Sequence, residues 1–198
     1  MTPSSTTLTD TAAPSRIVLI GMMGAGKSVV GGVVASRLIW PHLDSDLQIE
    51  RKTGQTVAQI FASHGEAAFR AQEAQALASA VCGEGPLVVS VAGGAVLSAD
   101  NRRLLSRAGL VVWLRAELAT LATRVVGGDH RPLLEGDRLE RLTLLYGERR
   151  PHYQQLADVV IDVDHLNPDE VADQVVTAYH AACSAARARS DVAGVRRA

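Results

Sequence analysis

Short apolar runs rich in β-branched residues alternate along the chain with longer segments in which apolar residues recur every three or four positions. The short runs have the length of strands, and their continuous apolar character is typical of strands buried on both faces of a sheet. We expect five such strands, at residues 16–20, 41–44, 87–94, 110–114 and 158–163. The longer segments have the length and apolar spacing of helices, as does a final segment at 167–183 with acidic residues in its first turn.

This alternation predicts an α/β fold of three layers, in which helices cover both faces of a five-stranded parallel sheet. A chain of 198 residues can bury one sizeable core, so we expect a single domain. The first 15 residues and the tail 184–198 carry few large apolar side chains to offset the entropy of ordering, and we expect both to be disordered. The domain is then predicted at 16–183.

Composition and charge exclude several classes of partner. Lys and Arg number 20 against 21 Asp and Glu, which gives no electrostatic preference for nucleic acid or anionic lipid. The sequence has no run of about 20 apolar residues and no apolar core of a signal peptide near its start. Cys82 and Cys183 form no metal-binding or redox pair. We therefore expect a cytoplasmic protein that binds neither nucleic acid nor membrane.

The segment GMMGAGKS, at residues 21–28, follows the first predicted strand and leads into the first predicted helix. It fits the phosphate-binding pattern G-x-x-x-x-G-K-S/T in the structural context which that pattern requires. Its glycines allow successive N–H groups to converge on an anion, Lys27 can reach the outer phosphates, and the Ser28 hydroxyl can bind Mg²⁺. The segment predicts a nucleoside triphosphate site formed by Gly24, Ala25, Gly26, Lys27, Ser28 and Val29.

A second ligand for magnesium must come from outside the third predicted strand. Motor ATPases usually carry an acid at the end of a central strand, but here Ser90, Val91 and Ala92 stand there, and no N-K-x-D sequence indicates a switch GTPase. Asp44 and Asp46 lie two residues apart at the end of the second predicted strand, where an extended backbone points both side chains the same way. One could hold magnesium while the other accepts a proton; the alternative is a turn that caps the next helix.

Several motifs in a fixed order make the chain similar to the shikimate kinase family, a P-loop group related to nucleoside monophosphate kinases. The resemblance covers about residues 16–175 and rests on GMMGAGKS, LDSDLQIE, TGQTVAQIFASHGEAAFRAQEAQAL, SVAGGAV, RPLL and ERRPHY. It implies an ATP-dependent, Mg²⁺-requiring kinase that phosphorylates the 3-hydroxyl of shikimate on the route to chorismate and aromatic amino acids. We expect such an enzyme to act as a monomer.

The resemblance assigns the phosphoryl-transfer chemistry to named residues. It implies that Ser28 and Asp44 hold Mg²⁺, with Asp44 acting through water, and that Asp46 accepts the proton of the attacking hydroxyl. Lys27 would stabilise the transferred phosphoryl group. A lid at about 124–137 would bring Arg131 to the γ-phosphate, and Arg124 matches the position that stacks on adenine. Leu166 replaces an arginine that contacts adenine in some relatives, which leaves the choice of base less determined.

The resemblance also implies a site for the substrate carboxylate within a substrate subdomain at about 45–75 and the helix around 149. Arg70 and Arg149 match carboxylate-binding positions, and guanidinium groups bind carboxylates in forked geometry. Arg150 is an alternative to Arg149, and both arginines could instead be solvated surface groups. Glu73, one turn after Arg70, could hold its guanidinium. Gly93 and Gly94 match two of three glycines expected beside the substrate; Ala92 replaces the first, which we expect to be harmless.

Two other functions fit parts of the same pattern. A kinase for another small hydroxylated acid, such as gluconate, would share the fold and phosphate loop. A non-catalytic nucleotide-binding module would share the phosphate loop, although such a module needs neither Asp46 nor a pair of carboxylate-binding arginines. Turnover across a panel of hydroxylated acids distinguishes the three.

Overall fold

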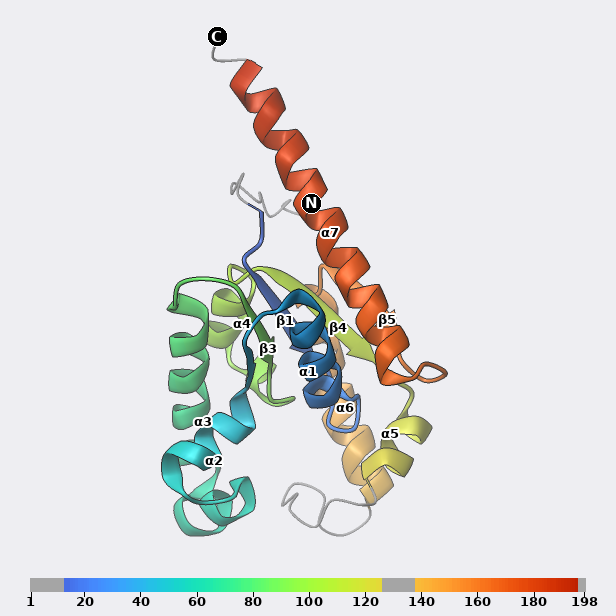
Figure 1. The fold of residues 1–198 in the computed structure, drawn as a ribbon. Helices are drawn as coiled ribbons and strands as arrows, with labels where there is room; N and C mark the ends of the chain where they lie inside the picture. Colours follow the sequence, from blue (N-terminus) through green and yellow to red (C-terminus); the bar gives the residue numbers. More distant parts are fainter. Residues whose placement is uncertain (1–12, 126–137, 196–198) are drawn as a thin grey trace, which may run out of the picture.

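A computed structural model describes residues 13–125 and 138–195 (Figure 1). Five strands form one sheet in the order β2-β3-β1-β4-β5, and every neighbouring pair is parallel. The strands are β1 (Arg16–Ile20), β2 (His42–Asp44), β3 (Leu87–Ser90), β4 (Leu110–Arg115) and β5 (Val159–Asp162). The predicted five-stranded parallel sheet is therefore confirmed. The central strand β1 is buried along its whole length, as its apolar residues 17–20 indicate.

Helices cover both faces of this sheet, which confirms the predicted three-layer α/β architecture. On one face α1 (Lys27–Leu38) packs against α7 (Pro168–Val195), and Arg37 joins them by ion pairs to Asp169 and Asp173. On the other face α4 (Ala99–Leu105) packs against α6 (Arg138–Leu156) and the short helix η1 (Ala95–Leu97). α5 (Leu118–Val125) contacts α6 beyond β4.

The last helix corrects one expectation from the sequence. Residues 184–195 of the tail that we expected to be disordered continue α7, and Figure 1 shows this end of the helix extending past the sheet. Alanine has the highest helix propensity of any residue, and the tail is rich in alanine and arginine. Ala186 is also buried, although its side chain is too small to count as a core residue in the sequence pattern. The predicted disorder at residues 1–15 falls mostly outside the described residues.

Two helices after β2 build a smaller core of their own. α2 (Ser45–Thr53) and α3 (Val57–Cys82) pack together, and α3 is interrupted at Gly65, whose φ of 78° is not helical. Their apolar cluster consists of Ile49, Ile60 and Phe69, flanked by Val57, Phe61 and Ala76. This cluster lies in the segment that the sequence predicts as a substrate subdomain, and it is separate from the core around the sheet.

The predicted lid at about 124–137 lies almost entirely outside the described residues, and Arg131 lies there with it. α5 ends at Val125, directly before this segment. Within the described ranges, no helix has both the length and the apolar character needed to cross a membrane.

Candidate active site

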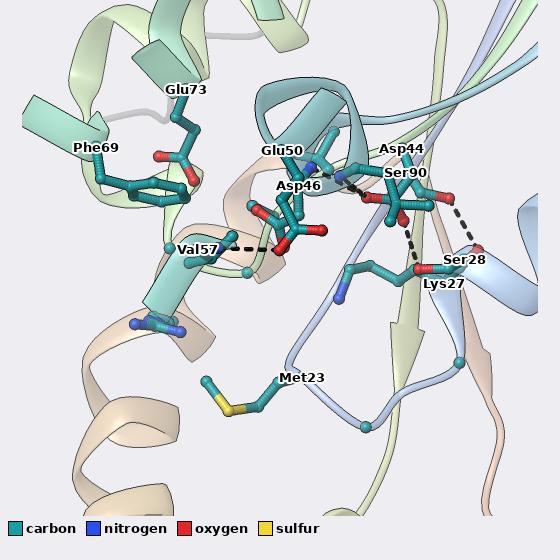
Figure 2. A pocket seen from close by; sticks show the side chains of 18 of the residues that line it. Met23, Lys27, Ser28, Asp44, Asp46, Glu50, Val57, Phe69, Glu73 and Ser90 are labelled. Atoms are coloured by element: carbon teal, nitrogen blue, oxygen red, sulfur yellow. Dashed lines mark hydrogen bonds between the residues drawn. The ribbon is translucent and has the colours of Figure 1, made fainter. Parts of the chain in front are cut away.

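A cavity of about 560 Å³ opens at the carboxyl end of the sheet, where the segments after β1, β2 and β3 meet α2 and α3 (Figure 2). Parallel α/β sheets form their ligand sites at this edge because all strands end there. The wall contains nearly every site residue predicted from the sequence within the described ranges, together with residues that were not predicted. They are Met23, Gly24, Gly26, Lys27, Ser28, Val29, Asp44, Asp46, Leu47, Glu50, Val57, Phe61, Phe69, Arg70, Glu73, Ser90, Val91, Ala92, Gly93, Gly94, Arg124 and Arg149.

The phosphate loop leads from β1 into the first turn of α1. Gly24 and Gly26 have φ of 84° and 90°, in the left-handed region that favours glycine. Gly26 is the N-cap of α1 and makes no side-chain capping bond, so the first N–H groups of the helix have no side-chain acceptor at this position. Such N–H groups, at the positive end of the helix dipole, form an anion site. The ammonium group of Lys27 folds back over the loop and donates to the carbonyls of Gly21 and Met22, at 2.9 Å each.

Asp44 serves two elements at once. Its Oδ1 accepts hydrogen bonds from the backbone N–H groups of Asp46 at 3.0 Å and Leu47 at 3.3 Å, which makes it the N-cap of α2. Its Oδ2 accepts a hydrogen bond from Ser28 Oγ at the start of α1 (Figure 2). The two interpretations that the sequence left open are therefore compatible: Asp44 caps a helix and also lies beside the phosphate loop.

Asp46 lies in the first turn of α2 with its carboxylate in the cavity wall, and Figure 2 shows it near Lys27. Its Oδ1 is buried and has no hydrogen-bond partner among the described residues. Burial raises the pKa of Asp46 to about 6, and the negative charge of Asp44 adds to this rise, while Lys27 and Arg70 oppose it. The site therefore holds a carboxylate that can gain or lose a proton close to neutral pH.

Arg70 on α3 faces the segment that follows β3. Its Nη1 donates to both oxygens of Glu73 at 3.0 Å, and its Nη2 donates to Glu66 at 3.0 Å. The guanidinium also lies over the ring of Phe69, 5.4 Å from its centre. A side chain at Gly94 would overlap this guanidinium, so the glycine lets the backbone approach it. Burial disfavours the charged form of Arg70, but Glu73 and Glu66 outweigh it and raise its pKa.

Glu73 occupies the space between two guanidinium groups. It is completely buried, which raises its pKa to about 7, and the charges of Arg70 and Arg149 act in the opposite direction. The helical pair of Arg70 and Glu73 expected from the sequence is thus present. Because the carboxylate accepts from Arg70 with both oxygens, it can hold the guanidinium in place at the cavity wall.

The structure distinguishes Arg149 from its neighbour. Arg149 on α6 is 2% exposed, lines the cavity, and has a buried Nε with no partner in the described part of the chain. Arg150 is exposed, lies over the ring of Tyr146, and does not line the cavity. The hydroxyl of Tyr153, one turn after Arg149, donates to the carbonyl of Gly93 at 2.7 Å. Arg149, not Arg150, is therefore brought together with Arg70 and the two glycines.

Alanine in the first glycine position is tolerated by the backbone. Among the described non-glycine residues, Ile39 alone has a positive φ. Ala92 therefore has an ordinary backbone conformation. Its N–H donates to Ser45 Oγ at 2.9 Å. The position needs no glycine for its backbone angles, which agrees with the expectation that Ala92 is harmless.

The nucleotide side of the cavity is described only in part. Arg124 at the end of α5 lines the cavity and donates to the carbonyl of Val163 at 3.0 Å. Leu166 packs against the main core. In the described ranges, no cluster of three or more His, Cys, Asp or Glu side chains could hold a metal ion. A cation at this site would therefore depend on Ser28, Asp44 and the phosphates that it accompanies.

Three polar residues of the site were missed in the sequence. Ser90 at the end of β3 donates to the carbonyl of Lys27 at 2.8 Å and contacts His42 Nε2 at 2.9 Å, which joins β2, β3 and the start of α1. Glu50, one turn after Asp46, lines the cavity and accepts from the N–H of Val57 at 2.9 Å. Ser45 lies between the two aspartates. The four-residue spacing from Asp46 could have indicated Glu50, whereas isolated serines give no such signal.

Comparison with known proteins relates the chain to one family of kinases. A family model described as shikimate kinase matches residues 23–180. The shikimate kinase of Symbiobacterium thermophilum is 46% identical over 164 residues, which cover 81% of this chain and 94% of that protein. The shikimate kinase of Ruegeria pomeroyi is 41% identical over 168 residues, which cover 84% of this chain and 86% of that protein.

Solved structures give the same relation. A shikimate kinase from Acinetobacter baumannii in complex with shikimate matches with a TM-score of 0.81 and 34% identity, covering 85% of this chain and 93% of that chain. A gluconokinase from Sinorhizobium meliloti 1021 matches with a TM-score of 0.59 and 21% identity, covering 90% of this chain and 99% of that chain. The second likeness shows a shared fold alone.

Burial of Asp46 predicts that Asp46→Asn stabilises the protein. The pKa rises from an ordinary 3.8 to about 6, so the unfolded chain ionises this group more easily than the folded one. The resulting penalty on folding is absent below about pH 4, grows between pH 4 and 6, and reaches about 3 kcal/mol above that range. We expect the variant to have a Tm several degrees above that of the wild type at pH 7.5, with a smaller difference at pH 4.5.

Thermal unfolding at both pH values measures this effect, and Glu84→Gln is the matched control. Glu84 is exposed, so neutralising it should shift stability by less than about 0.5 kcal/mol at either pH. A Tm of Asp46→Asn equal to or below the wild-type value at pH 7.5 would show that the carboxylate carries no such penalty.

Proposed function

The chain belongs to the shikimate kinase family of ATP-dependent kinases, and we propose that it transfers the γ-phosphate of ATP to the 3-hydroxyl of shikimate. The observation that carries this proposal is that Asp46 lies in a cavity wall with Lys27 and Arg70, and that its buried Oδ1 has no hydrogen-bond partner among the described residues. The charges of Lys27 and Arg70 act on Asp46 and partly oppose the rise in its pKa that burial causes. One cavity thus offers a proton acceptor, a cation of the phosphate loop and a cation for an acidic substrate.

In this proposal Asp46 is the general base. Its carboxylate, in the cavity wall, accepts a hydrogen bond from the attacking hydroxyl and takes the proton as the new P–O bond forms and the bond from the γ-phosphorus to ADP breaks. Phosphoryl transfer proceeds through a loose transition state, so the main task of the site is to hold the alcohol in line with the γ-phosphorus. Lys27 exchanges its bonds to Gly21 and Met22 for bonds to phosphate oxygens, where it stabilises the negative charge of the transferred group.

The donors beside the phosphate loop fit Mg²⁺. Ser28 Oγ and Asp44 Oδ2 are hard oxygen ligands that contact each other at the cavity wall, and Mg²⁺ is commonly held by one or two protein oxygens, water and phosphate. The bound ion would offset negative charge on the phosphates of the nucleotide. Asp44 is fixed for this role because its other oxygen caps α2.

The acceptor end of the cavity suits a hydroxylated carboxylate. Arg70 and Arg149 offer guanidinium groups that bind a carboxylate in forked geometry, and both line the cavity. Gly93 and Gly94 lie directly against them, because a side chain at either glycine would meet Arg149 or Arg70. This arrangement places the backbone of Gly93 and Gly94 in the cavity wall beside both arginines, where we propose that a ring with three hydroxyls binds.

We assign the nucleotide to the opposite end of the cavity, on Gly24, Ala25, Gly26, Lys27, Ser28 and Val29. Arg124 is the proposed contact to adenine. Arg131 and the lid at about 124–137, which lie outside the described residues, are proposed to close over the γ-phosphate. Exclusion of water by this closure would favour transfer to the alcohol over hydrolysis of ATP.

A gluconate kinase and a non-catalytic nucleotide-binding module fit less well. The gluconokinase likeness stands at 21% identity, whereas shikimate kinases reach 46% over most of the chain. A module that only binds nucleotide has no need for a buried carboxylate and two arginines in the same cavity. We propose that the enzyme acts as a monomer in the cytoplasm.

The test of this proposal is release of ADP, measured in a coupled assay over a panel of hydroxylated acids that includes shikimate and gluconate. We expect turnover of shikimate and little of the others. Asp46→Asn should bind ATP almost normally but lower kcat at least about a hundredfold, because it removes the base.

In the wild type, kcat/KM should fall as pH drops below about 6, where Asp46 becomes protonated.

Each arm of this assay can fail separately. Turnover of gluconate but not shikimate would replace the proposed acceptor, and turnover of none would favour the nucleotide-binding module. A variant Asp46→Asn with wild-type kcat would remove Asp46 from the mechanism while leaving the substrate in place.

The two adjacent arginines of α6 give a matched pair of variants. We expect Arg149→Lys to raise the KM for shikimate about tenfold or more with a smaller change in kcat, since lysine cannot reproduce a forked bond to a carboxylate. Arg150→Lys should leave both constants unchanged, because Arg150 is exposed and outside the cavity wall. Steady-state kinetics of the two variants decides which arginine binds the substrate. Equal effects of the two substitutions would contradict the assignment to Arg149.

A further inference from the structure

Ser45 joins two edges of the active site through a single hydrogen bond. It lies between Asp44 and Asp46 at the start of α2, is 1% exposed, and does not line the cavity. Its Oγ accepts from the N–H of Ala92 at 2.9 Å. Ala92 belongs to the segment after β3, so this bond connects the start of α2 to the residues that lead into Gly93 and Gly94.

The backbone at this point determines where the Asp46 carboxylate lies. Asp44 is held by both oxygens, through the cap of α2 and through Ser28. The Asp46 carboxylate has no comparable support, because its Oδ1 is buried without a hydrogen-bond partner in the described part of the chain. The segment around it is held by other bonds: the N–H groups of Asp46 and Leu47 donate to Asp44, and Ser45 Oγ accepts from the N–H of Ala92.

Gly93 and Gly94 extend the effect of the Ser45 bond to the acceptor site. These glycines follow Ala92 directly and lie against Arg149 and Arg70, which we assign to the substrate carboxylate. The bond between Ser45 and Ala92 therefore links the segment that carries Asp46 to the segment that lies against these two arginines. A displacement of about 1 Å between reacting groups can lower a rate by about a hundredfold.

From these contacts we infer that Ser45 is a positioning residue for Asp46, fixing the base relative to the acceptor through its hydrogen bond with Ala92. The inference rests on the proposed role of Asp46. Ser45 takes no part in the chemistry itself, because it is shielded from the cavity. Its contribution is geometric: it keeps in line with the attacking hydroxyl a carboxylate whose Oδ1 has no hydrogen-bond partner among the described residues.

Three single variants test this role. Ser45→Ala removes the acceptor for the Ala92 N–H and should lower kcat about tenfold, with the KM for ATP and for shikimate within about twofold of wild type. Ser45→Thr keeps the hydroxyl and should restore most of the activity. Ser98→Ala is the control: Ser98 Oγ caps α4 outside the cavity wall, so its loss should lower Tm without changing kcat.

A double-mutant cycle separates positioning of Asp46 from general weakening of the fold. If Ser45 acts through Asp46, Ser45→Ala should cost little or nothing further in kcat when Asp46 is already Asn. The inference is overturned if Ser45→Ala has wild-type kcat, or if it lowers kcat by the same factor in both backgrounds. Failure of the underlying function gives a different result, since Asp46→Asn alone would then retain turnover.

Discussion

Burial of the Asp46 carboxylate is the constraint on which the rest of the site depends. Its Oδ1 is out of contact with water and has no hydrogen-bond partner in the described ranges, so the fold bears a cost that packing elsewhere must offset. Lys27 and Arg70 reduce this cost by their charge, and burial still dominates, holding the pKa near 6. The same imbalance suits Asp46 to the role of base that we propose for it, since a base works best when its pKa lies close to the working pH.

The parallel sheet explains how such distant residues meet. β1, β2 and β3 end at one edge, and the segments that follow them supply the phosphate loop, the aspartates and the glycines. Hydrogen bonds across this edge then fix their relative positions. Asp44 joins β2 to α1 through Ser28, Ser90 joins β3 to the carbonyl of Lys27, and Ser45 joins α2 to Ala92. A rigid frame of this kind is what in-line transfer requires.

The sequence was sufficient to predict the sheet and most of the groups to which we assign the chemistry. Continuous apolar runs predicted β1 to β5, and local patterns of a few residues predicted the phosphate loop and the Asp44–Asp46 pair, because these features are encoded within one segment. Similarity to the shikimate kinase family added Arg70 and Arg149 to the predicted site residues. Arg149 could not be separated from Arg150, since neighbours on a helix point in different directions and only packing of α6 decides which one is buried.

Other features depended on contacts that no single segment contains. Ser45 and Ser90 act through partners 47 and 63 residues away, so neither serine is marked by its own surroundings. Residues 184–195 are helical because alanine favours helices and because they continue a helix that is already packed on the sheet. An argument from large apolar side chains alone underestimates the helical tendency of this tail.

The most direct test of the central claim is a titration of the Asp46 carboxyl group in the free protein. Carbon-13 NMR of aspartate-labelled protein, with Asp46→Asn to identify the resonance, reports the protonation of this side chain alone. The account predicts a pKa of about 6. A pKa near 4, the ordinary value for an exposed aspartate, would show that the carboxylate is hydrated and would contradict the account.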